Sequence, residues 1–437
     1  MTIDDHAEST DTPLAGPDTL LGMIQRGRGA CRPAALAQPT IARELVVDCI
    51  VGDPRWDHQV ESRGWLYANL VVDLGIDPIR FRPAYAGPLD PTGDSDAWLT
   101  LGVLGHLAAR GTAGSIAELR HYLRSGRDLN IALDRLIPFV DHPEAQGLLD
   151  DILQVYDNDQ LLDCVGFCSP AELALPPWPQ WRRESARIDR TVRAAELVRA
   201  QHARLARDRG PSDRELVLRA AVAAKVVAAP STLDLSAEQW ETTLLTVATD
   251  YSYGADIGWT RREQIALRRC LRQLNSPSAS EWARANVDLD SDLGYWALSI
   301  LSSTATPADA PALLELLTEA LARGNDHIVD QCTLVSALAP LEHVAAVPII
   351  EEIFDTTVYS YLRRQCAEAL SRLSTEFGAG RAVECLDDCE SGTRAVAIAC
   401  VDIGVPGVRQ RLDHLAEDPS EDDDNRLAAR ARVGGIR

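Results

Sequence analysis

The sequence predicts an all-α protein built as a solenoid of helical hairpins, and three observations lead to this prediction. Cys332, Cys366 and Cys400 are spaced 34 residues apart, and one further step back reaches Leu298. Small or apolar residues recur four positions before and three positions after each of these sites, and such offsets share one face of an α-helix. Second helical patterns lie between these faces, at 308–322, 342–354 and 376–388. A repeat of this length with two helices per unit is typical of an α-solenoid.

The 34-residue register also predicts which side chains are buried. The positions four before are Gly294, Ile328, Leu362 and Val396, and those three after are Leu301, Val335, Ala369 and Ile403. We expect Ile328, Leu362, Val396, Val335 and Ile403 to be buried on equivalent helices. The three cysteines should be unpaired and slow to react, because a buried thiol packs as a small apolar group.

Over residues 291–404 the pattern resembles HEAT-type repeats, the antiparallel helix pairs of the armadillo-like class. A looser resemblance covers 35–75, where one helical pattern ends at Gly52-Asp53-Pro54 and the next at Gly75. The resemblance implies a right-handed α-α superhelix of HEAT-like helical hairpins. It implies a binding surface only by analogy, since one fold hosts many functions.

The chain divides into five parts on composition. Residues 1–16 are acidic, lack Lys and Arg, and are expected to be a disordered tail. We expect an N-terminal helical HEAT-like segment over 17–165, interrupted by a proline-rich loop at 76–96 in which Phe81 and Tyr85 are candidate anchors. Residues 166–181 contain Pro-Pro-Trp-Pro and are expected to be a linker. An Arg-rich helical segment, 182–290, precedes the repeats of 291–437, which end in a terminal cap.

The composition limits the classes of partner. The 437 residues are 46% hydrophobic but only 5% aromatic, and the formal net charge is −22. Such an acidic field repels phosphate backbones and anionic membranes, which disfavours nucleic acid and membrane partners. The sequence contains no run of about 18 apolar residues, so we expect no membrane-spanning helix. The N-terminus lacks a signal-peptide pattern, so we expect a cytoplasmic protein with reduced cysteines.

Sequence motifs give no support for catalysis or for a cofactor. The chain lacks the HExxH, Walker and GxSxG patterns. Cys164 and Cys168 share one helix face, as do Cys385 and Cys389, but a zinc site needs a second ligand pair at matching spacing. We therefore predict no metal ion, no cofactor and no catalytic residues.

The middle of the chain is locally basic. Residues 182–209 hold nine arginines against four acidic residues, and 261–272 hold five more arginines. The candidate partner-binding residues are Arg187, Arg190, Arg261, Arg262, Arg268 and Trp259. Three interpretations stay open: a solvated surface neutralised by its own acids, a docking surface for an acidic protein, or a nucleic-acid site.

The function predicted from the sequence is a non-catalytic scaffold or adaptor that binds a partner protein, an acidic one, on the concave face of the solenoid. The alternative is a HEAT-like enzyme acting on nucleic acid or on a cofactor, either glycosylase-like or lyase-like. That alternative needs a basic groove with aromatic side chains, for which Trp240 and Trp259 are the available residues. The sequence does not indicate the partner's identity or the oligomeric state.

Overall fold

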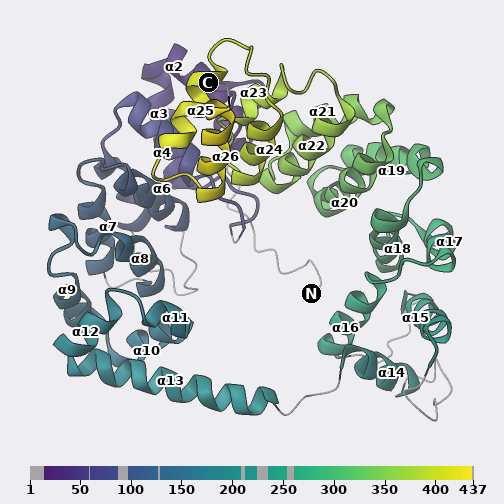
Figure 1. The fold of residues 1–437 in the computed structure, drawn as a ribbon, viewed down its shortest axis with the longest axis horizontal. Coiled ribbons are helices and arrows are strands. Elements are labelled where there is room, and N and C mark those ends of the chain that lie inside the picture. The colour runs from purple at the N-terminus through teal and green to yellow at the C-terminus, as the bar shows by residue number, and fades with distance from the viewer. Residues whose placement is uncertain are drawn as a thin grey trace. The chain divides into compact units, whose positions relative to one another are not determined.

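A computed structural model describes residues 14–58, 60–86, 97–125, 128–207, 212–223, 235–252 and 260–435. Every regular element in these ranges is a helix, which confirms the all-α prediction (Figure 1). The chain groups into two compact units. The N/C unit comprises residues 11–208, 358–360 and 378–437, and the middle unit comprises 209–357 and 361–377.

The N/C unit begins with α1 to α13, and its second part holds α23 to α26. The α-helices of the first part are α1 (Leu20–Arg26), α2 (Cys31–Ala37), α3 (Pro39–Gly52), α4 (Gly64–Leu74), α5 (Pro83–Ala86), α6 (Trp98–Ala109), α7 (Ser115–Arg124), α8 (Leu129–Leu136), α9 (Leu148–Val155), α10 (Asn158–Phe167), α11 (Pro170–Leu173), α12 (Trp178–Glu184) and α13 (Ala186–Arg207). Those of the second part are α23 (Arg381–Cys385), α24 (Ser391–Cys400), α25 (Val408–Glu417) and α26 (Asp423–Gly434). The short 3-10 helices are η2 (Pro78–Phe81), η3 (Ile137–Phe139) and η4 (Pro143–Ala145).

The middle unit is helical throughout its described residues. Its α-helices are α14 (Asp213–Ala223), α15 (Ala237–Ser252), α16 (Arg261–Leu271), α17 (Pro277–Asn286), α18 (Asp292–Thr304), α19 (Ala310–Arg323), α20 (Ile328–Leu338), α21 (Val347–Thr356) and most of α22 (Ser360–Leu373). The 3-10 helices are η5 (Pro307–Asp309), η6 (Gly324–His327), η7 (Ala339–Leu341) and η8 (Val344–Ala346). Helices pack on their chain neighbours and on the helix after next, as α19 and α18 do against α20.

Helices from the early and the late part of the described chain meet inside the N/C unit. Figure 1 shows the purple helices α2–α4 beside the yellow α25 and α26. The indole Nε1–H of Trp65 on α4 donates to Asp418, at 2.9 Å, and Arg110 pairs with the same carboxylate at 2.6 Å. Arg28 pairs with Glu384 at 3.0 Å, and both side chains are largely buried. The unit is therefore stabilised by polar contacts between residues more than 300 positions apart.

The predicted register is observed on three of the four helices. On α18, α20 and α22 the side chains of Leu298, Ile328, Leu362 and Val335 are buried, as is Cys366. These helices repeat the same buried face because their apolar residues keep the 34-residue spacing. The second helices differ more from the prediction: α21 starts only at Val347, and α23 is reduced to Arg381–Cys385.

On α24 the predicted register is wrong. Val396 is half-buried, Cys400 is exposed and Ile403 lies half-buried beyond the end of the helix. The buried residues are instead Thr393, Arg394, Ala397 and Ile398. The guanidinium of Arg394 donates to Glu421 at 2.7 Å through two nitrogens. Because Arg394 points into the protein, α24 buries the face that carries Arg394 and not the face of Val396 and Cys400 that the 34-residue spacing predicts.

The three evenly spaced cysteines should therefore differ in reactivity. Burial raises the pKa of the Cys366 thiol, and it raises that of Cys332, which is half-buried, to about 12. Since thiolate is the reactive form, we expect a thiol reagent to modify Cys400 first and Cys366 only on unfolding. Mass spectrometry of peptides from a labelling time course would measure the order. Equal rates at Cys400 and Cys366 would contradict the burial described here.

The segments predicted to lack regular structure are partly helical. In the 76–96 loop, η2 and α5 carry Phe81 and Tyr85, which are both buried, as predicted for anchors. Residues 87–96 lie outside the described part. The predicted linker 166–181 contains α11 and the start of α12 and lies within the N/C unit. Of the predicted tail, residues 1–13 lie outside the described residues, and Ala15 is hydrogen-bonded to Gln25 and Arg26 at 2.8 Å each.

Candidate functional site

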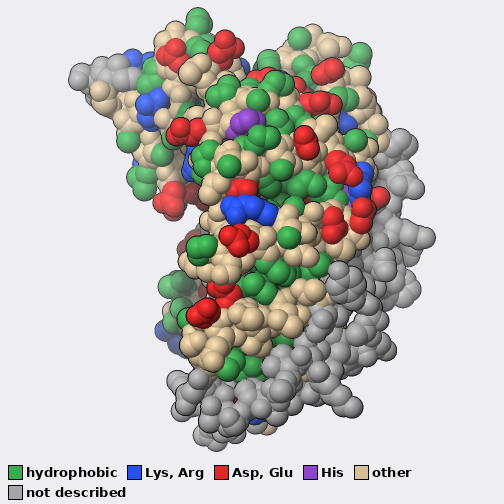
Figure 2. All heavy atoms as spheres, turned by 90° about the vertical axis from the view of Figure 1, so that its right-hand side faces the viewer, with side chains coloured by type: hydrophobic (Ala, Val, Ile, Leu, Met, Phe, Trp, Pro, Cys, Tyr) green, Lys and Arg blue, Asp and Glu red, His purple; other side chains and the backbone are tan. Residues whose placement is uncertain are grey.

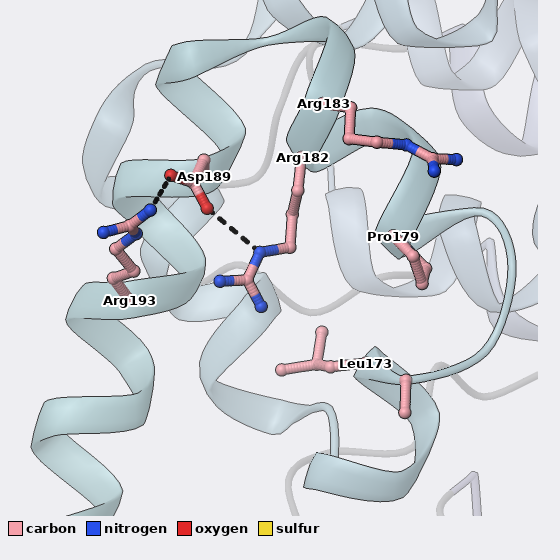
Figure 3. A pocket seen from close by; sticks show the side chains of 7 residues that line it. Leu173, Pro179, Arg182, Arg183, Asp189 and Arg193 are labelled. Atoms are coloured by element: carbon pink, nitrogen blue, oxygen red, sulfur yellow. Dashed lines mark hydrogen bonds and ion pairs between the residues drawn. The ribbon is translucent and has the colours of Figure 1, made fainter.

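An arginine-lined cavity lies beside α11, α12 and α13 in the N/C unit. Its volume is about 490 Å³, and Figure 3 shows its lining residues. They are Leu173, Ala174, Pro179, Arg182, Arg183, Asp189 and Arg193. We call this site the arginine pocket.

The local sequence explains how the pocket is built. Ser169 caps α11, since its hydroxyl accepts from the Glu172 N–H at 3.2 Å while Glu172 accepts from the Ser169 N–H. Trp178 and Trp181 are buried with their rings edge to face, at a centroid distance of 5.4 Å. These indoles fix α12, so the two arginines that follow Trp181 are held at the rim.

Asp189 on α13 connects two arginines of the pocket. Its carboxylate accepts from Arg182 at 3.1 Å and from Arg193 at 2.8 Å (Figure 3). Arg182 also donates to Glu196 at 3.1 Å. The hydrogen bond from Arg193, followed by that from Arg182, lowers the pKa of Asp189, so the carboxylate stays ionised well into the acidic range.

Arg183 differs from the other two arginines. Its guanidinium makes no hydrogen bond or ion pair with any residue that the structure describes, and the side chain is exposed. Figure 3 shows it directed away from Asp189, toward the side of the pocket where Pro179 lies. The pocket therefore presents one guanidinium without a counter-ion among the described residues and another, Arg193, that shares its carboxylate.

The remaining wall of the pocket is apolar. Leu173, Ala174 and Pro179 form it. Leu175, two residues after Leu173, leaves 60% of its surface exposed, and Leu197, one turn after Arg193, leaves 72% exposed. Exposed arginine and exposed aliphatic side chains thus occur together on α12, α13 and the turn that precedes α12.

Of the residues predicted from the sequence, Arg187 has a structural role. It donates to the carbonyl oxygens of Leu153, at 2.9 Å, and of Tyr156, and to Asn158 at 2.7 Å. These bonds attach α13 to the end of α9 and the start of α10. Replacing Arg187 would therefore disturb the packing of α13 as well as any surface it forms.

The other predicted residues are solvent-facing or lie in the middle unit. Arg190 is exposed and donates only to the carbonyl oxygen of Ala186 among the described residues. Arg261 and Arg262 are exposed on α16, while Arg268 is half-buried there. Because α16 belongs to the middle unit, a surface joining these residues to Arg190 stays a prediction. Trp259 lies outside the described residues.

Trp240, the other aromatic residue considered for a groove, is half-buried and contacts its own unit. The guanidinium of Arg214 lies 4.8 Å from the Trp240 ring centroid, a cation–π distance. This contact engages one face of the indole within the middle unit.

The described residues hold no cluster of three or more His, Cys, Asp or Glu side chains suited to a metal ion. In the Cys164–Cys168 pair, the Cys168 thiol lies 3.6 Å from the Cys164 carbonyl oxygen as a donor. Burial raises the pKa of Cys164 to about 12 and also raises that of Cys168. Both thiols are thus protonated near neutral pH, so a metal ion would have to displace their protons.

Sequence reasoning missed Arg183, Arg193 and Asp189 as site residues. It selected the basic stretch as a candidate surface but could not rank its arginines by their partners. The Pro-Pro-Trp-Pro stretch was an available signal, because a rigid segment with two tryptophans before an arginine pair suggests a fixed surface rather than a linker.

Comparisons with protein-family models, with curated proteins and with solved structures found no match for this chain. Across the part of the chain that is described, none of the helices combines the length and the apolar character needed to cross a membrane.

Proposed function

We propose that this protein is a non-catalytic scaffold or adaptor of the HEAT-like α-solenoid class, which binds an acidic partner protein. The packing of each helix on its neighbours and on the helix after next agrees with stacked hairpins, as in α24 and α25 against α26. Stacked hairpins offer long surfaces that suit partner binding.

The observation that carries the proposal is the surplus of positive charge around α12 and α13 in a protein of net charge −22. Part of the basic stretch is neutralised internally, through Asp189 and Glu196. Arg183 and Arg190 have no acidic partner among the described residues, so this surface can pair with acids from outside. A positive patch in a negative body steers acidic proteins to one place.

The same charge distribution argues against the enzyme alternative that acts on nucleic acid. On the face drawn in Figure 2, acidic side chains are scattered among apolar and uncharged ones, and basic side chains appear at fewer places. A long polyanion would meet the repulsion of the protein's net charge of −22 as well as any local attraction.

We expect the tagged protein to capture a protein partner from its own cells, and charge reversals to map the contact. Arg183→Glu with Arg190→Glu should reduce capture roughly tenfold or more, and Arg261→Glu with Arg262→Glu tests the middle unit separately. All four side chains are exposed, so the fold should tolerate the changes, which circular dichroism can check. Duplex DNA should not bind at moderate salt. Salt-sensitive DNA binding that the reversals abolish would overturn the scaffold proposal in favour of a nucleic-acid function.

A further inference from the structure

We propose that the arginine pocket binds a short acidic segment of the partner that also carries apolar side chains. A carboxylate of the segment pairs with Arg183, and an apolar side chain packs on Ala174 and Pro179, the two exposed apolar residues of the lining. This inference rests on the proposed function and names where and how the partner is recognised.

The charges in the pocket select a carboxylate. Three guanidinium groups line it, whereas Asp189 is the single carboxylate in the lining, with Glu196 reaching Arg182 from outside. The planar guanidinium of Arg183 offers parallel N–H donors that match a carboxylate in a bidentate pair. A partner aspartate or glutamate would thus supply the counter-ion that Arg183 lacks among the described residues.

The apolar wall selects a side chain next to that carboxylate. Single exposed aliphatic residues are common on protein surfaces and need no partner. Here, however, Leu175 is 60% exposed beside the wall of the pocket, and Leu197 is 72% exposed one turn beyond Arg193. Covering them would add the free energy of burying apolar surface to that of the ion pair.

The size and surroundings of the pocket favour a peptide segment over a polyanion. A volume of about 490 Å³ accommodates a few side chains. Glu172, Glu184 and Glu196 are exposed on the elements around the pocket, so a uniformly charged strand would meet like charges once it left the arginines. A segment with one or two acids between apolar residues meets the arginines without that repulsion.

Site-specific photo-crosslinking tests this inference. A benzoylphenylalanine replaces Leu175 in the full-length protein, and the crosslinked peptide is identified by mass spectrometry. Leu427 on α26 is the matched control, because it is the same residue type in the same unit and is 61% exposed. We expect the Leu175 position to crosslink one partner segment that contains Asp or Glu beside apolar residues, and the Leu427 position to leave that segment uncrosslinked.

A charge swap then tests the ion pair. Arg183→Glu should weaken binding of the identified segment roughly tenfold or more, and changing the segment's acid to arginine should restore it. If no protein is captured at all, the proposed function fails. If a partner is captured but its crosslinked segment lacks acids, crosslinks equally at Leu427, or binds Arg183→Glu unchanged, the pocket inference alone is overturned. Retention of nucleic acid in place of protein would overturn both.

Discussion

Replacing Glu421 with alanine is expected to lower the free energy of unfolding by about 3–5 kcal/mol, because it leaves the buried charge of Arg394 without its carboxylate. The side chains of Arg394 and Glu421 are 3% and 0% exposed. Arg394 also donates to the carbonyl oxygens of Asp388, at 2.7 Å, and Cys389, at 2.8 Å, and lies 3.9 Å from the Trp65 ring centroid. These neighbours hold the guanidinium in place, so it cannot turn out to water when Glu421 is lost.

Two controls separate the buried charge from the loss of side-chain volume. The double variant Arg394→Met with Glu421→Met should lose less stability than Glu421→Ala alone, because an apolar pair leaves no unpaired charge. Glu44→Ala removes the exposed partner of Arg80 and should change stability little. Urea unfolding followed by circular dichroism measures all three. A Glu421→Ala midpoint equal to that of Glu44→Ala would show that the Arg394–Glu421 pair does not stabilise the N/C unit.

The sequence predicted the local part of the fold. Helix faces follow from spacing, so the buried positions of Leu298, Ile328 and Leu362 could be derived without knowing any neighbour. Helix ends also follow from local chemistry. Gly75 adopts φ 65° at the end of α4 and donates its N–H to the carbonyl oxygen of Val72, as expected for a glycine stop.

The contacts between the early helices and α23–α26 could not be predicted in this way. Periodicity identifies which face of a helix is buried but not which segment covers it. Arginine is rarely buried unless it is paired, so the residue type alone does not indicate that Arg394 is buried. Its partner Glu421 stood in an acidic run that is ordinarily solvated. Only the three-dimensional arrangement shows that the two side chains meet.

The candidate site illustrates the same limit. The basic character of 182–209 was evident from composition, but the role of each arginine depends on which oxygen lies within its reach. Arg187 reaches backbone carbonyl oxygens and becomes structural, whereas Arg183 reaches none of the described residues and stays available. Sequence reasoning therefore selected the same basic stretch that lines the candidate pocket but, within it, favoured Arg187 over Arg183.

The stability of the N/C unit is expected to fall as the pH drops from about 6.5 toward about 3, starting above the range where carboxylates titrate, because of His106 on α6. Burial, followed by the charges of Arg110, Arg135 and Arg394, lowers the pKa of His106 to about 3, while Asp418 opposes this shift. An unfolded histidine takes up a proton near pH 6.5. The folded protein does not, so acidification favours the unfolded state.

Linkage sets the size of this effect and the variant that tests it. We expect the free energy of unfolding to drop by about 1–2 kcal/mol between pH 7 and pH 5 from this residue. His106→Gln should remove that part of the drop, whereas His58→Gln, at an exposed position, should leave it unchanged. Urea midpoints measured from pH 7 to pH 5 give the comparison. A slope that His106→Gln does not alter would mean that His106 takes up its proton at the same pH in the folded and unfolded states. Burial and the charges of Arg110, Arg135 and Arg394 would then be offset, with Asp418 as the neighbouring group that favours the protonated imidazole.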